Sequence, residues 1–279
     1  MFSKGVQHML VAGIFFSMMN LGVKYLSNIP AIEVVFFRCI ISVVISVAML
    51  RKAKISLLGN NKPILFLRGF FGVIALSLFF TTLQEMPLAS AVTFQQLSPV
   101  FTAIFGIFLL KEKVKALQWL FFLIAFGGVA LIKGFDTNIS TYHLLLALGS
   151  AIFAALAYNM VRLLKDTDHP LVVVLYFPLV ATPFTALYSY FNWVMPYKWE
   201  WLIILGIGVA TQIAQVNMTK ALQMEKVGTI TIVKYLTVVY AIFFGYTLFG
   251  EELILATIIG IIMIISGVVF NLFYSKNSL

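Results

Sequence analysis

Charged residues are scarce in this sequence, and their scarcity excludes most soluble folds. Of the 279 residues only 10% are Asp, Glu, Lys or Arg, whereas 62% are hydrophobic, and the mean hydropathy is +1.03. A soluble domain carries about 25% charged residues. The composition therefore indicates an integral membrane protein and argues against a soluble enzyme.

Cysteine and the common catalytic motifs are equally sparse. The one cysteine, Cys39, lies inside an apolar stretch and has no second cysteine with which to form an intrachain disulfide or a CxxC motif. Redox and zinc-site functions are therefore not expected. The sequence also has no HExxH, no P-loop and no aspartate pair within an apolar stretch, which argues against an intramembrane protease and an ATP-driven pump. We expect neither a metal nor a cofactor, and no enzymatic activity.

Long apolar stretches make up nearly all of the sequence, and short links join them. A stretch of about 20 apolar residues is long enough to cross a bilayer as an α-helix. Pro30, Pro63 and Pro170 stand where three stretches begin, a position at which the missing N–H of proline costs little. We therefore expect an all-α integral membrane protein with ten transmembrane helices. The approximate spans are residues 5–26, 30–50, 63–83, 88–110, 114–133, 142–164, 170–191, 199–222, 227–249 and 253–273.

Lysine and arginine are distributed unevenly between the two sides of these spans. With the N-terminus inside, 12 of the 19 basic residues fall on the cytoplasmic side, 4 within spans, and only Lys24, Lys133 and Lys198 on the opposite side. This bias predicts that both termini are cytoplasmic. The basic residues that give the net charge of +9 are then expected to contact the anionic membrane surface, so no nucleic-acid partner is expected. We expect a multi-pass protein of the plasma membrane, which would be the inner membrane of a bacterium. The sequence gives no prediction of the oligomeric state.

The two halves of the sequence resemble each other at an offset of 139 residues. Residues 89–131 align without a gap with residues 228–270, which pairs Glu112 with Glu251. Each half holds five spans, an odd number, so the second copy must insert with the opposite orientation. Inverted repeats of this kind are typical of secondary transporters, whose substrate site lies near the midplane between the repeats. The two expected repeats are residues 1–134 and 135–279.

One local difference separates the repeats. Ser98 and Pro99 of the first half correspond to Thr237 and Val238 of the second. Proline inside a helix removes a backbone hydrogen bond and bends the chain. We therefore expect any proline-dependent bend in helix four to be absent from helix nine.

Short motifs stand at matching places in the two halves. In the first half they are Met86–Ala91, Leu97–Val100 and Leu110–Glu112, and in the second half Glu225–Ile230 and Phe249–Glu251. Together with the ten spans they resemble the EamA-type families of the drug/metabolite transporter superfamily, over almost the whole chain. The resemblance implies a ten-helix transporter that moves a small metabolite by alternating access.

A polar pair lies in the middle of spans four and nine. Gln95 and Lys234 occupy equivalent positions of the repeat. Because a cation in hydrocarbon costs several kcal/mol, Lys234 is expected to face a cavity or a passenger. In this interpretation Lys234 attracts a carboxylate or phosphate and Gln95 orients it. The alternative is that Lys234 extends along its helix to the cytoplasmic surface.

Three further basic residues lie within spans. Arg38 of span two stands where the resembled family often carries an arginine, and its planar fork suits a carboxylate. A packing role, in which Arg38 binds carbonyls or polar side chains, is the alternative. Arg68 and Lys220 lie near the cytoplasmic ends of their spans, where we expect them to extend to water.

Uncharged polar residues enlarge the candidate site. Asn20 and Asn159 are equivalent in the repeat, and Gln215 lies on the polar face of span eight. Hydrogen bonding between helices is the alternative for each amide. The tyrosines considered for stacking on a passenger are Tyr235, Tyr240, Tyr158 and Tyr176. The predicted substrate-binding set is Lys234, Gln95, Arg38, Asn20, Asn159, Gln215, Tyr235 and Tyr176.

Acidic residues avoid the middle of every span. Glu33 and Glu85 lie at helix ends, and Glu112, Glu251 and Glu252 follow spans. A buried carboxylate is the usual proton or sodium relay, so its absence favours uniport, exchange or coupling by less obvious groups. The excess of basic residues favours an organic anion or zwitterion as passenger: an amino acid, a carboxylate or a nucleoside-like metabolite. The alternatives are an exporter of drugs or hydrophobic cations, and a membrane subunit that does not transport.

Overall fold

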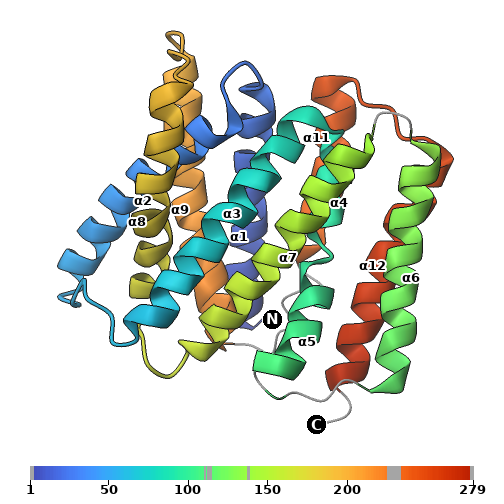
Figure 1. Ribbon diagram of the computed structural model, residues 1–279, viewed down its shortest axis with the longest axis horizontal. Coiled ribbons are helices and arrows are strands. Elements are labelled where there is room, and N and C mark those ends of the chain that lie inside the picture. The colour runs from blue at the N-terminus through green and yellow to red at the C-terminus, as the bar shows by residue number, and fades with distance from the viewer. Residues whose placement is uncertain (1–2, 110, 112–114, 137–138, 225–233, 277–279) are drawn as a thin grey trace.

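The computed structural model describes residues 3–109, 111, 115–136, 139–224 and 234–276, and in that part the regular structure is entirely helical. Figure 1 shows the helices arranged as a bundle. Their bounds are α1 Lys4–Tyr25, α2 Ala31–Lys52, α3 Lys62–Glu85, α4 Leu88–Gln95, α5 Ser98–Leu109, α6 Ala116–Phe135, α7 Thr141–Leu163, α8 Pro170–Phe191, α9 Glu200–Met224, α11 Leu236–Phe249 and α12 Leu255–Lys276.

Within the described residues, eight helical stretches are long and apolar enough to cross a membrane, with α4 and α5 forming one stretch, Leu88–Leu109. Two shorter apolar helices, Leu236–Phe249 and Leu255–Asn271, complete the set. These ten segments correspond to the ten predicted spans. The prediction of an all-α membrane fold with ten helices in two inverted repeats is confirmed.

Helix packing follows the internal repeat. α1 packs along α9 in the same way that its repeat mate α7 packs along α3. Two further large pairings join repeat mates to each other: α2 with α8, and α6 with α12. α4 packs against α11 of the other repeat. The first and second halves of the chain are therefore interleaved, and the centre of the bundle is built by both.

The α6 and α12 pair stands at one side of the bundle (Figure 1). Its two backbones approach closely because glycines lie at the contact. A Cβ atom added at Gly128 would lie 2.5 Å from the carbonyl oxygen of Gly260, and one added at Gly267 would lie 2.6 Å from that of Phe121. Small residues at such contacts let membrane helices pack tightly in place of a hydrophobic driving force.

Both repeats carry an interruption at the same place. The first lies between α4 and α5, where Gln96 and Leu97 are not helical, and the second is at Tyr235, the position equivalent to Gln96. An interruption therefore occurs in both repeats, although only the first has a proline beside it. In the second repeat the Thr237 hydroxyl donates a 2.7 Å hydrogen bond to the Lys234 carbonyl at the interruption. A hydroxyl that binds a backbone carbonyl in this way competes with the helical ladder.

Candidate functional site

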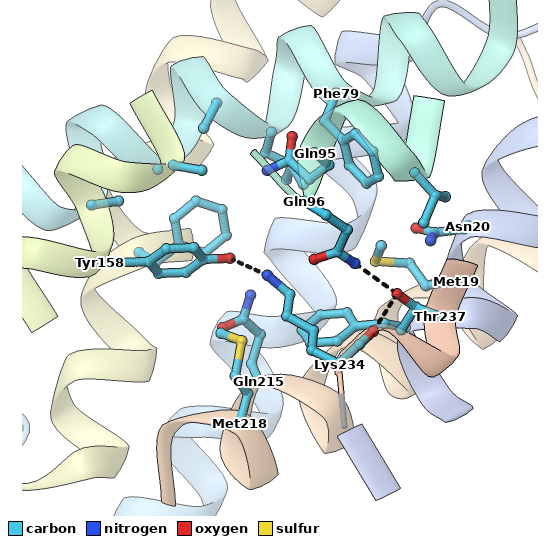
Figure 2. A pocket seen from close by; sticks show the side chains of 18 of the residues that line it. Met19, Asn20, Phe79, Gln95, Gln96, Tyr158, Gln215, Met218, Lys234 and Thr237 are labelled. Atoms are coloured by element: carbon cyan, nitrogen blue, oxygen red, sulfur yellow. Dashed lines mark hydrogen bonds between the residues drawn. The ribbon is translucent and has the colours of Figure 1, made fainter. Parts of the chain in front are cut away.

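A cavity of about 120 Å³ lies among the helices of both repeats (Figure 2). Metabolite-sized pockets have volumes of about 300–1,000 Å³, so this cavity is smaller than a typical ligand pocket. Apolar side chains form much of its wall. The polar residues that line it are Asn20, Arg38, Arg68, Gln95, Gln96, Tyr158, Gln215, Lys234 and Thr237.

Lys234 points into this cavity and towards Tyr158 (Figure 2). Its Nζ atom lies 3.4 Å from the Tyr158 hydroxyl oxygen and 5.1 Å from the centroid of the Tyr158 ring. This position matches the interpretation in which the ammonium group faces a cavity, rather than the one in which it extends to the surface. Gln95 also lines the cavity, and its Oε1 atom lies 2.7 Å from the Ser150 hydroxyl.

The two helix interruptions meet at the cavity. Gln96 donates a 2.9 Å hydrogen bond from Nε2 to the Thr237 hydroxyl, which itself donates to the Lys234 carbonyl (Figure 2). Discontinuous helices at the interface of two repeats are typical of transporter substrate sites. Gln96 was absent from the predicted set, although its place beside Gln95 and just before Ser98 and Pro99 was a usable signal.

Arg38 makes packing contacts and also borders the cavity. Its side chain is 1% exposed, and its Nε atom donates a 3.0 Å hydrogen bond to the Thr211 hydroxyl, which ties α2 to α9. The guanidinium carbon lies 5.2 Å from the Phe177 ring centroid and 5.7 Å from that of Phe80. Its Nη1 atom has no hydrogen-bond partner among the described residues, and the side chain lines the cavity.

Arg68 does not extend to the cytoplasmic end of its helix, which corrects the expectation from the sequence. It is 6% exposed, lines the cavity and places its guanidinium carbon 5.1 Å from the Phe177 ring centroid. A Cβ atom at Gly72 would lie 2.6 Å from Arg68 Nη1, so the side chain runs one turn deeper into the bundle. The missing side chain of Gly72 leaves the room, and the face of Phe177 attracts the cation.

The other predicted residues divide between the cavity wall and the surrounding packing. Asn20 and Gln215 line the cavity. Asn159 is buried outside the lining and donates a 3.2 Å hydrogen bond to the Thr102 carbonyl. Its neighbour Tyr158 takes the cavity position, because one residue along a helix turns the side chain by about 100°.

Two predicted tyrosines also lie outside the described lining. The Tyr176 hydroxyl accepts a 3.5 Å hydrogen bond from the Gly59 amide, in the link between α2 and α3. Tyr235 is buried at the interruption before α11. The structure thus brings together Lys234, Gln95, Arg38, Asn20 and Gln215 from the predicted set, and adds Arg68, Gln96, Tyr158 and Thr237.

Comparison with known proteins agrees with this architecture. The EamA-like transporter family matches residues 3–134 and again residues 141–273. The pseudopaline exporter of Pseudomonas aeruginosa is 31% identical, over 94% of this chain and 93% of its own. Human solute carrier family 35 member G1 is 32% identical, over 88% of this chain and 73% of its own.

A solved crystal structure with 18% sequence identity superposes on the full length of both chains with a TM-score of 0.73, which shows the shared fold. The family match covers both halves of the chain, and each half contributes helices to the cavity described above. The protein therefore belongs to the EamA-like transporter family and is a multi-pass membrane transporter of a small molecule, not an enzyme.

Proposed function

We propose that this protein moves a small organic anion or zwitterion across the membrane by alternating access. The charge of the cavity carries the proposal. Its described lining contains three cations, Arg38, Arg68 and Lys234, and neither Asp nor Glu. Buried charges require partners, and a negatively charged passenger supplies the missing ones.

The same charges argue against the alternative of a hydrophobic-cation exporter. Two like unit charges 4 Å apart repel by about 4 kcal/mol at an effective dielectric constant of about 20. A cationic passenger in this cavity would meet that repulsion from Arg38, Arg68 and Lys234, without a described carboxylate to offset it. No contact in the described structure favours a membrane subunit that does not transport.

The two repeats, residues 1–134 and 135–279, are the units that we propose move relative to each other. Inverted repeats alternate the access of a site at their interface by rocking. Two observations support a change of access at this site: both interruptions border the cavity, and the cavity is too small for most metabolites until the helices separate. The asymmetry of basic residues supports a plasma membrane location with both termini cytoplasmic. The similarity to the pseudopaline exporter supports an organic solute that leaves the cell.

The test is counterflow in proteoliposomes with labelled passengers of defined charge. The panel contains organic acids, amino acids, nucleoside monophosphates and hydrophobic cations. We expect accumulation of at least one anion or zwitterion and of no hydrophobic cation, and we expect Lys234→Ala to abolish that accumulation. Lys220→Ala is the matched control, because this lysine also lies in a membrane helix but not in the cavity lining. Transport of cations alone, or full transport by Lys234→Ala, would overturn the proposal.

A further inference from the structure

We propose that Arg38 and Arg68 form a second anion subsite, distinct from Lys234, so that the preferred substrate carries two acidic groups. The inference rests on the proposed anion transport and makes its substrate class more specific. It also gives Arg68, which was expected to have no part in the site, a role in selecting the substrate.

The two arginines are held as a unit by one aromatic ring. Their guanidinium carbons lie 5.2 Å and 5.1 Å from the centroid of the Phe177 ring, although Arg38 belongs to α2 and Arg68 to α3. Two cations on one buried ring repel each other, and a ring quadrupole only partly offsets that repulsion. An anion bound between or beside them removes it.

Unused hydrogen-bond donors point to the same ligand. Arg38 Nη1 and Arg68 Nε are buried, and neither has a partner among the described residues. An unsatisfied buried donor is costly, and more so when it is charged. Carboxylates and phosphates match the planar donor fork of arginine with two oxygens and a negative charge, whereas a neutral carbonyl offers a single oxygen and no charge.

Lys234 contacts a different aromatic side chain from the ring that the two arginines share. It precedes α11 and contacts Tyr158 of α7, whereas the arginines contact Phe177 of α8. All three cations line the same cavity. A substrate with one acidic group can neutralise either Lys234 or the arginine pair. A substrate with two acidic groups can neutralise both.

Gly72 positions the second subsite without contributing a charge. A Cβ atom at this residue would lie 2.6 Å from Arg68 Nη1 and 2.6 Å from Cδ2 of Phe177. Replacement by alanine would therefore push the guanidinium group away from the ring while keeping the net charge of the cavity. This offers a variant that separates the geometry of the subsite from its electrostatics.

The experiment compares dicarboxylates with their own monoamides. The purified protein in detergent is titrated with the straight-chain series from malonate to suberate and with the monoamide of each acid, which keeps the length but removes one charge. Dissociation constants come from calorimetry and are checked by thermal shift. We expect at least one dicarboxylate to bind ten times or more tightly than its monoamide.

Three variants then test where that preference arises. Arg68→Gln is expected to lower dicarboxylate affinity at least tenfold while changing monoamide affinity less than threefold, and Gly72→Ala is expected to do the same. Arg51→Gln is the matched control, because it removes an exposed arginine from the end of α2, outside the cavity lining. The control is expected to keep the wild-type preference.

The other possible results of these titrations would contradict the second anion subsite. Equal binding of dicarboxylates and monoamides, lost in Lys234→Ala, would overturn the second subsite and leave the proposed anion transport intact. An unchanged preference in Arg68→Gln would also overturn it. Failure of every dicarboxylate and every monoamide to bind would overturn the two-acid substrate, while anion counterflow in proteoliposomes would still report separately on the proposed function.

Discussion

Lys24 Nζ lies 2.8 Å from Glu251 Oε1, and this ion pair joins the last turn of α1 to the link that follows α11. The other carboxylate oxygen of Glu251 accepts a 2.7 Å hydrogen bond from the Leu88 amide, at the start of α4. Lys24 Nζ also donates to the Met86 carbonyl at 2.5 Å. One ion pair therefore connects the two repeats at the end of the bundle away from the chain termini. Because both side chains are only 13–14% exposed, water and salt screen the pair weakly.

Glu251→Gln is expected to loosen this end of the bundle. Loss of one partner leaves Lys24 partly buried without its counterion, at a cost of about 1–3 kcal/mol, below the cost for a fully buried pair. The opening can be measured with a single cysteine at Val92, which lines the cavity, in a Cys39→Ala background. The readout is the rate at which Val92→Cys is alkylated by a reagent added on the side of the membrane opposite the termini. We expect that rate to rise at least fivefold. Glu85→Gln is the control, because the Glu85 side chain is 46% exposed in its pair with His143 and should have little effect. Equal rates in wild type and Glu251→Gln would contradict the prediction.

Thr211→Val is expected to separate the packing role of Arg38 from its role in binding. The variant removes the acceptor of the Arg38 Nε hydrogen bond but leaves Nη1 and the Phe177 contact in place. The unsatisfied donor should lower stability by about 1–3 kcal/mol. Anion affinity should change less than twofold, whereas Arg38→Lys should lower both stability and affinity because it loses the fork. Melting temperature in detergent and calorimetric titration measure the two effects. A Thr211→Val protein with unchanged melting temperature would show that the hydrogen bond contributes nothing.

Gly267→Ala and Gly134→Ala are expected to change stability in different ways. At Gly267 the new Cβ would lie 2.6 Å from the Phe121 carbonyl oxygen and 2.8 Å from the Ala125 amide nitrogen, so α6 and α12 must separate. Overpacking of this kind costs about 1–3 kcal/mol. At Gly134 the new Cβ would have no neighbour within 4 Å, and alanine favours the helix by up to about 1 kcal/mol. Chemical denaturation in detergent compares the two variants with wild type. A Gly267→Ala protein as stable as Gly134→Ala would refute the close backbone contact.

Cysteine labelling tests the proposed orientation in the membrane. Lys54 and Lys198 are exposed and lie at opposite ends of the bundle, so cysteines placed there in a Cys39→Ala background are accessible to reagents. We expect an impermeant maleimide added outside whole cells to label Lys198→Cys but not Lys54→Cys. Asp136 and Lys113 are less suitable positions for labelling, because Asp136 is only 8% exposed and Lys113 lies outside the described residues. Labelling of Lys54→Cys from outside would reverse the orientation.

The aromatic side chains beside Lys198 agree with a position at the water interface. Trp193, Tyr197 and Trp199 are exposed in and around the link between α8 and α9. Tryptophan and tyrosine gather at the boundary between the hydrocarbon and the head groups of a bilayer. This feature marks an interface without distinguishing the two faces of the membrane, so the labelling result decides between them.

The helices and their repeat could be predicted from the sequence because they depend on local properties. A run of about 20 apolar residues in a bilayer has to satisfy its own backbone hydrogen bonds, and the helix is the solution available to a single segment. The inward position of Lys234 and Arg38 follows from the same physics, since hydrocarbon excludes charge. The sequence by itself therefore determined the ten-helix architecture and indicated which charged residues form the core of the candidate site.

Tertiary structure alone decided how the side chains meet. Arg68 turns into the bundle because Gly72 leaves space and Phe177, more than 100 residues away in the chain, presents its ring. Tyr158 rather than Asn159 reaches the cavity because the packing of α7 sets its rotation about its own axis. Such choices depend on contacts between segments that are distant in sequence, which a hydropathy pattern does not encode. The sequence thus determined which residues could be buried, and the packing of the two repeats determined which of them face one another.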